Sequence, residues 1–353
     1  MLRPGRVGVL TFHRCVNYGS YWQTRALVEG LRQRGVDAVV LDHRSAPATL
    51  REWRCALQPT LPTRVDAADR RRYAAKARAL AAAASALALT EPFALESPED
   101  AGPFAALVVG SDEVWNLHHP WYGGVPAFFG EGWRTDRLVA HAASFGSYYS
   151  DAPLEQCWRE CLRRFEAISV RDHHSSQLVH ESVGAYPPLV LDPCLQFNVG
   201  PDPGTPSENL VVYGHNFSPA FVDGVTRWAR ERGRHILSVG YRNDWADEQW
   251  IDASPEEFAG AIASAAAVAT NFFHGCVFAL RYAKPFACEA MGYRWHKVQS
   301  LVSAVGAQAQ LASADADASF FEHALSSAPA AHVRSALERM RNESDAYLDD
   351  ALA

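Results

Sequence analysis

The chain has 353 residues, more than one ordinary hydrophobic core holds, so two domains are expected. Hydrophobic residues make up 48% and charged residues 21%, as in globular rather than disordered proteins. The formal net charge of −7 argues against a general nucleic-acid-binding protein, which would need a basic surface. Because no apolar run is long enough to cross a bilayer and the first residues lack the apolar core of a signal peptide, we expect a cytoplasmic location.

The seven cysteines are scattered and form no C-x-x-C pair, which favours reduced, buried thiols. Cys157 and Cys161 fall on one helical face, but two thiols do not make a zinc site. The adjacent histidines, His118-His119 and His173-His174, also lack the spacing of metal ligands. We therefore predict no metal site.

The first half of the chain alternates strands with helices. Val7–Phe12 is expected to form a buried strand, Tyr21–Gln33 a helix and Val36–Leu41 a second strand. A strand–helix–strand unit of this length implies a parallel sheet. Further strands are expected at Ala105–Val109, Leu138–Ser144, Ala167–Val170 and Leu189–Leu191.

Each of these strands ends in a cluster of small or charged residues, which a parallel sheet gathers at one edge. The loop His13–Ser20 follows the first strand, where such sheets bind ligands, but it lacks the G-x-G-x-x-G pattern of dinucleotide sites. Asn17 and Gly19 in this loop fit a structural turn as well as a binding role. Asp112 and Asp172 could form a carboxylate pair, although helix caps and turns use aspartate in the same way.

Residues 45–100 carry the least information. Asp66–Leu89 is rich in alanine and arginine and is expected to be helical. Its basic end could contact an anionic membrane or a lipid-linked substrate, although a run of charges is more often a solvated face. The basic residues are Arg70, Arg71, Arg72, Lys76 and Arg78.

The second half repeats the alternation after Asn198–Ser207, which has the composition of a linker. Strands are expected at Leu210–Tyr213, His235–Val239, Ala265–Ala269 and Pro285–Cys288, with helices at Pro219–Arg232, after Ser254 and at Arg334–Leu352. We therefore predict an α/β protein with Rossmann-like domains at 1–197 and 208–325, a linker at 198–207 and a C-terminal helix at 326–353. Two such halves imply a cleft between their strand ends, where we expect the site.

The stretch Val268–Leu280 is a strand, a polar turn and a helix that starts near His274. Thr270 or Asn271 could cap this helix, because their side-chain oxygens accept from its first amides. His274 would then stand beside unpaired N–H groups at the positive end of the helix dipole, where anions bind. Gly275 would leave room for a ligand to approach the backbone. A single histidine at such a junction is also often structural, so both interpretations stay open.

An ordered set of motifs runs through the chain. It consists of Asn17-Tyr18-Gly19-Ser20-x-x-Gln23, Gly110-Ser-Asp-Glu-Val-Trp-Asn116, Ser144-Phe-Gly146, Ser169-Val-Arg-Asp172, Leu191-Asp-Pro193, Ser254-Pro-Glu-Glu-Phe258 and Thr270-Asn-Phe-Phe-His-Gly275. Together they resemble the polysaccharide pyruvyl transferase family, and the likeness extends to about Phe286. The resemblance implies two Rossmann-like halves in a GT-B-like arrangement. It also implies an enzyme that moves pyruvate from phosphoenolpyruvate onto two hydroxyls of a sugar, making a cyclic ketal.

The resemblance maps the family's functional positions onto Arg171 and His274. A guanidinium binds a carboxylate or a phosphate bidentately, which suits a donor that carries both. A histidine titrates near neutrality and could protonate the methylene carbon of the donor. Phosphate would leave from the helix start at Gly275, and His215 is the next candidate for the acid. Two positions depart from the family pattern, since Phe272 stands where relatives often have serine or arginine and Glu113 replaces a common glutamine.

The remaining predicted site residues divide into two groups. The donor-binding group is Asn271, Gly275, His215, Asn216 and Lys284. The acceptor-binding group is Asn17, Tyr18, Gly19, Ser20, Ser111, Asp112 and Trp115.

The expected partners are phosphoenolpyruvate as co-substrate, with no cofactor, and a sugar or polyol acceptor that could be lipid-linked. We expect no nucleic acid and at most peripheral membrane contact. The alternatives are a nucleotide-sugar glycosyltransferase and an inactive binding or scaffold protein on the same fold.

Overall fold

The computed structural model describes residues 5–150, 152–289, 292 and 295–353. Within it the chain forms two compact units. Unit 1 comprises Met1–Glu52, Ala83–Val199 and Glu338–Ala353, and unit 2 comprises Trp53–Ala82 and Gly200–Leu337.

This division differs from the predicted domains in two places. Trp53–Ala82 lies in the first half of the sequence but belongs to unit 2, and the C-terminal helix is divided at Glu338. The stretch predicted as a linker, 198–207, contains no helix or strand, and the boundary between the units falls within it, after Val199.

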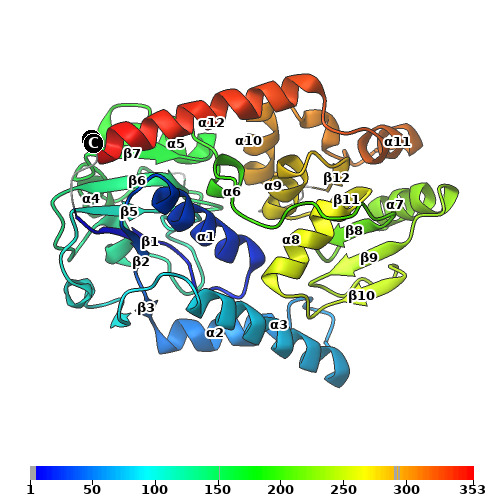
Figure 1. The fold of residues 1–353 in the computed structure, drawn as a ribbon, viewed down its shortest axis with the longest axis horizontal. Helices are drawn as coiled ribbons and strands as arrows, with labels where there is room; N and C mark the ends of the chain where they lie inside the picture. Colours follow the sequence, from blue (N-terminus) through cyan, green and yellow to red (C-terminus); the bar gives the residue numbers. More distant parts are fainter. Residues whose placement is uncertain (1–4, 151, 290–291, 293–294) are drawn as a thin grey trace. The chain divides into compact units, whose positions relative to one another are not determined.

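Unit 1 is built on a parallel sheet of five strands in the order β2-β1-β5-β6-β7 (Figure 1). The strands are β1 Val7–Leu10, β2 Ala38–Val40, β5 Ala106–Val109, β6 Leu138–Ala143 and β7 Ala167–Val170. Every residue of the first four is buried, which explains their almost continuous apolar sequences, because helices cover both faces of a parallel sheet. A short parallel pair, β3 His43–Arg44 and β4 Phe93–Ala94, completes the strands of this unit.

The strand expected at Leu189–Leu191 does not form. Leu189 makes only an isolated bridge with Val170. Pro188 comes directly before it and Pro193 follows shortly after, and a proline has no N–H to donate to a ladder. The segment therefore forms a single parallel bridge beside the edge strand β7 and no strand of its own.

The helices of unit 1 start where polar side chains cap them. Asn17 accepts from the amide of Gly19 at 2.7 Å and so begins α1, and Asp172 accepts from the amide of Ser175 to begin α5. The helices are α1 Tyr18–Gln33, α2 Ala46–Ala56 (which continues into unit 2), α4 Gln156–Leu162, α5 His173–Val183 and α6 Pro193–Gln196, with 3-10 turns at η1 Pro98–Ala101 and η2 Pro126–Phe129.

Unit 2 has a second parallel sheet of five strands, in the order β10-β9-β8-β11-β12 (Figure 1). The strands are β8 Leu210–Tyr213, β9 Ile236–Val239, β10 Glu248–Trp250, β11 Ala267–Thr270 and β12 Phe286–Cys288. Both sheets start from an interior strand and extend to each side of it, which is the Rossmann-like pattern.

The helices of unit 2 include one with the predicted start, since Ser254 and Glu257 form a reciprocal capping box at α8. The helices are α3 Ala67–Ser85 (whose last residues belong to unit 1), α7 Pro219–Glu231, α8 Pro255–Ser264, α9 Phe273–Arg281, α10 Trp295–Val305 and α11 Ala318–Ser326, with a 3-10 turn at η4 Gln308–Gln310. The last helix, α12 Ala331–Leu352, begins in unit 2 and ends in unit 1. Across the described ranges, each helix is either too short or too polar to span a bilayer.

Candidate functional site

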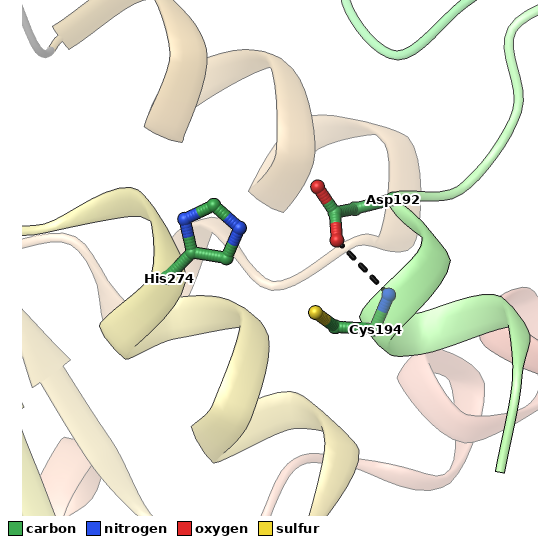
Figure 2. A group of neighbouring side chains, drawn as sticks. All are labelled: Asp192, Cys194 and His274. Atoms are coloured by element: carbon green, nitrogen blue, oxygen red, sulfur yellow. Dashed lines mark hydrogen bonds between the residues drawn. The ribbon is translucent and has the colours of Figure 1, made fainter. Parts of the chain in front are cut away.

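Arg171 holds the carboxyl ends of β5 and β7 together in unit 1. Its Nη1 donates to Asp192 Oδ2 at 2.7 Å and to Ser111 Oγ at 3.3 Å, and its Nη2 donates to Asp112 Oδ1 at 3.2 Å. Asp192 also caps α6 by accepting from the amide of Cys194 at 3.0 Å (Figure 2). One guanidinium thus joins three segments that are distant in the sequence.

The Arg171 side chain is only 3% exposed, while those of Asp192 and Asp112 are 0% and 10% exposed. Burial alone would lower the pKa of Arg171, but the nearby Asp112 and Asp192 carboxylates raise that pKa above its ordinary value. Arg171 therefore stays charged in a buried place.

The network continues to the first helix. Ser20 Oγ donates to Asp112 Oδ2 at 2.7 Å, and Ser20 lies in the first turn of α1, just after the cap Asn17. Asp112 itself has a positive φ of 72°, an uncommon backbone conformation for a residue other than glycine. Of the predicted acceptor residues, the structure therefore brings Ser20, Ser111 and Asp112 together around Arg171.

Two other predicted acceptor residues belong to the core of unit 1. Trp115 is fully buried, its indole N–H donates to the carbonyl of Phe128 at 2.9 Å, and its ring lies 5.5 Å from that of Phe145. Tyr18 is fully buried as well. Packing accounts for Trp115, because a buried indole needs a partner for its N–H.

In unit 2, His215 and Asn271 come together at the carboxyl ends of β8 and β11. Asn271 Nδ2 donates to the carbonyl of His215 at 2.8 Å. The imidazole of His215 lies 5.4 Å from the ring of Phe272 and 5.1 Å from that of Tyr241. An aromatic cluster thus surrounds this predicted donor residue, and Phe272 is part of it.

His274 lies in the first turn of α9, as predicted, and Figure 2 shows its ring projecting from the start of that helix. It is 9% exposed, and its ring lies 5.1 Å from that of Phe273. The predicted cap is wrong: Phe272 occupies the cap position and makes no side-chain capping bond. Thr270 Oγ1 donates to the carbonyl of Tyr213 at 2.6 Å and accepts from the amide of Phe272 at 3.1 Å, one residue before the helix begins.

Gly275 has a packing reason to be glycine. A Cβ at this position would lie 2.0 Å from Thr270 Oγ1, far inside van der Waals contact. The close approach of α9 to β11 therefore accounts for the residue without a ligand.

The other two predicted donor residues lie apart from this group or face solvent. Lys284 is in the turn between α9 and β12, at the amino edge of the sheet, whereas Asn271 follows β11 at the carboxyl edge. Partial burial lowers the pKa of Lys284. Asn216 is exposed and has a positive φ of 58°, which asparagine tolerates better than most residues.

Sequence reasoning missed that α3 contributes a side chain to the carboxyl edge of the sheet in unit 2. Lys76 Nζ donates to the carbonyl of Gly240 at 2.7 Å and lies 3.9 Å from the centre of the Tyr241 ring. The available signal was the helical spacing of Asp69, Tyr73 and Lys76, which places them on one face. The interpretation of this segment as a solvated basic face is wrong for Lys76, which is buried.

Several solved structures have a similar fold. The S. aureus MnaA–UDP co-structure has 11% sequence identity and a TM-score of 0.50, covering 98% of this chain and 97% of its own. AviGT4, a glycosyltransferase involved in avilamycin A biosynthesis, has 12% identity and a TM-score of 0.46, covering 99% and 97%. A mutant O-GlcNAc transferase of Thermobaculum terrenum has 13% identity and a TM-score of 0.43. The match covers 98% of this chain and 63% of the transferase. At these identities the likeness concerns the fold alone.

The fold class is therefore an α/β protein with two Rossmann-like units, each built on a parallel sheet of five strands. A search of curated proteins found no match to the chain. The model of the polysaccharide pyruvyl transferase family, however, matches residues 17–291. The chain belongs to that family, which indicates a transferase of the pyruvyl transferase kind.

Proposed function

We propose that this protein transfers pyruvate from phosphoenolpyruvate to two hydroxyls of a saccharide or related polyol, forming a ketal. The observation that carries the proposal is the family match over residues 17–291, which includes His274 in the first turn of α9. Phosphoenolpyruvate is an anion, and the positive end of a helix favours anions.

The reaction needs a proton donor. Protonation of the methylene carbon gives an oxocarbenium centre, which one acceptor hydroxyl attacks. The bond from carbon to the phosphate oxygen breaks, and the second hydroxyl then completes the ketal. The two acceptor hydroxyls release two protons. One returns to the general acid, which gave its proton to the new methyl group, and the other leaves with phosphate. We assign the donation of the first proton to His274.

We propose that Arg171 binds the anionic groups of the donor, although its guanidinium is already engaged in two ion pairs. Its guanidinium already binds the carboxylates of Asp112 and Asp192. A donor carboxylate or phosphate would have to share or replace these partners. Donor affinity and protein stability must therefore be measured separately in variants of Arg171.

The first experiment is calorimetric titration of the wild-type protein with phosphoenolpyruvate and, separately, with UDP- and GDP-sugars. Binding of phosphoenolpyruvate alone supports the proposal. Binding of a nucleotide sugar alone would favour a glycosyltransferase, and binding of neither would favour an inactive member of the family. Release of phosphate from phosphoenolpyruvate is then measured with a panel of sugar acceptors.

A further inference from the structure

Helix α3 contacts the segment that follows β9 through several side chains. Besides the bond from Lys76 to Gly240, Tyr73 Oη accepts from the amide of Arg242 at 3.0 Å. Asp69 pairs with the Arg242 guanidinium at 3.0 Å. Arg72 pairs with Asp252 further along, also at 3.0 Å. The helix thus holds both the backbone and the side chains of this segment.

Lys76 is the most constrained of these residues. It is 4% exposed, and lysine is rarely buried because removing an ammonium from water is costly. Its Nζ donates to the Gly240 carbonyl and faces the Tyr241 ring in cation–π geometry. Burial lowers the pKa of Lys76 to about 7.

The segment that Lys76 contacts leads directly to the predicted donor residues. The Tyr241 ring lies 5.1 Å from the imidazole of His215 and 5.2 Å from the ring of Phe272. Asn243 Nδ2 donates to the carbonyl of Gly214 at 2.9 Å, so the segment is also bonded to the end of β8. Phe272 in turn is the residue that precedes α9 and His274.

We propose that Lys76 is a positioning residue of the donor side, which holds Gly240 and Tyr241 and through them orients His215 and Phe272 beside the start of α9. The donor is the phosphoenolpyruvate of the proposed function, on which this part of the inference rests. The positioning itself follows from contacts within unit 2.

Lys76→Met tests this role, because it removes the ammonium while keeping an unbranched side chain of similar length. Arg78→Met is the matched control, since Arg78 is exposed and lies on the same helix. Lys76→Arg keeps a charged donor and is the conservative variant. Hydrogen exchange of the amides at 240–243 and 214–216 is measured by mass spectrometry, together with the melting temperature and phosphoenolpyruvate affinity.

In Lys76→Met we expect exchange at 240–243 to rise about tenfold or more, as for the loss of a hydrogen bond to a charged group. The affinity for phosphoenolpyruvate should fall about tenfold, and Lys76→Arg should recover part of it. Arg78→Met should change neither quantity. Unchanged exchange at 240–243, or a rise spread evenly over unit 2, would overturn the positioning role.

If Lys76→Met does not fold, Tyr73→Phe replaces it, because this variant removes only the oxygen that accepts from the Arg242 amide. It should raise exchange at the same amides by a smaller factor, and unchanged exchange there would count against the proposal. If the wild-type protein binds no phosphoenolpyruvate, the proposed function fails. The exchange measurement then still decides whether Lys76 orders the segment.

Discussion

Arg171 Nη1 lies 2.7 Å from Asp192 Oδ2, and both side chains are almost completely removed from solvent. A guanidinium in this position can bind a ligand or hold a fold together, and the two roles predict different phenotypes. The ion pairs belong entirely to unit 1, so the structural role can be measured without any ligand.

Arg171→Met should lower the free energy of unfolding by about 3–5 kcal/mol, because it leaves two buried carboxylates without their counter-ion. Urea denaturation followed by circular dichroism measures the change. Arg6→Met is the control, since the pair of Arg6 with Asp37 is largely exposed and should contribute less than about 1 kcal/mol. If the variant is as stable as wild type and has lost only its affinity for phosphoenolpyruvate, the structural role is contradicted. Donor binding would then be the role of Arg171.

Gly275→Ala should destabilise the protein by about 1–3 kcal/mol, because the new methyl group would collide with Thr270. Gly260→Ala in α8 is the matched control, since a Cβ there meets no atom within 4 Å. That change should stabilise the protein by about 0.5–1 kcal/mol, as alanine is the better helix former. Thermal unfolding of the two variants gives the comparison, and equal melting temperatures would disprove the packing explanation.

His274→Ala should reduce turnover by about 10²–10⁴-fold if His274 is the general acid. His274→Gln can hydrogen-bond to phosphate but cannot protonate carbon, so it should restore affinity more than rate. Single-turnover phosphate release with an accepted sugar is the measurement, and His323→Gln, an exposed change on α11, is the control. A His274→Gln enzyme near the wild-type rate would move the acid elsewhere, with His215 tested next.

Acid should destabilise unit 1 through His141. This histidine is fully buried and bonded through Nε2 to Gln196 Oε1 at 2.8 Å, and burial lowers its pKa to about 4. The unfolded chain takes up this proton at a higher pH than the folded chain does. The contribution of His141 to stability is therefore fully present above about pH 6.5 and is lost as the pH drops toward about 4. The slope from this group is at most about 1.4 kcal/mol per pH unit. His141→Gln should be less stable at pH 7 but show a flatter pH profile, and an unchanged profile would show that other groups dominate.

Burial of Lys76 should make the stability of the protein depend on pH in the alkaline range as well. Its folded pKa of about 7 lies below the ordinary value of 10.5, so the unfolded state binds the extra proton between these values. The wild-type protein should therefore gain stability relative to Lys76→Met as the pH rises from about 7 toward 10. Denaturant unfolding of both proteins at matched pH values gives this difference. A constant difference would mean that the lysine keeps its ordinary pKa when buried.

Local sequence was enough to predict the elements whose bonding is local. The buried strands β1 and β8 are continuous apolar runs, and the caps at Asn17 and Ser254 use neighbours within three residues. The parallel sheets followed from the alternation of strand and helix, because short connections leave few other topologies. The motifs then sufficed to place the chain in its family.

Only the tertiary structure decided how individual polar residues are used. Arg171 meets Asp112 across 59 positions, and Lys76 meets Gly240 across 164, separations at which no periodicity carries information. Tertiary contacts also placed Lys76, from a helix in the first half of the sequence, in unit 2. A buried charge or donor must find a partner wherever the fold brings one, and that choice is made by packing rather than by neighbours in the chain.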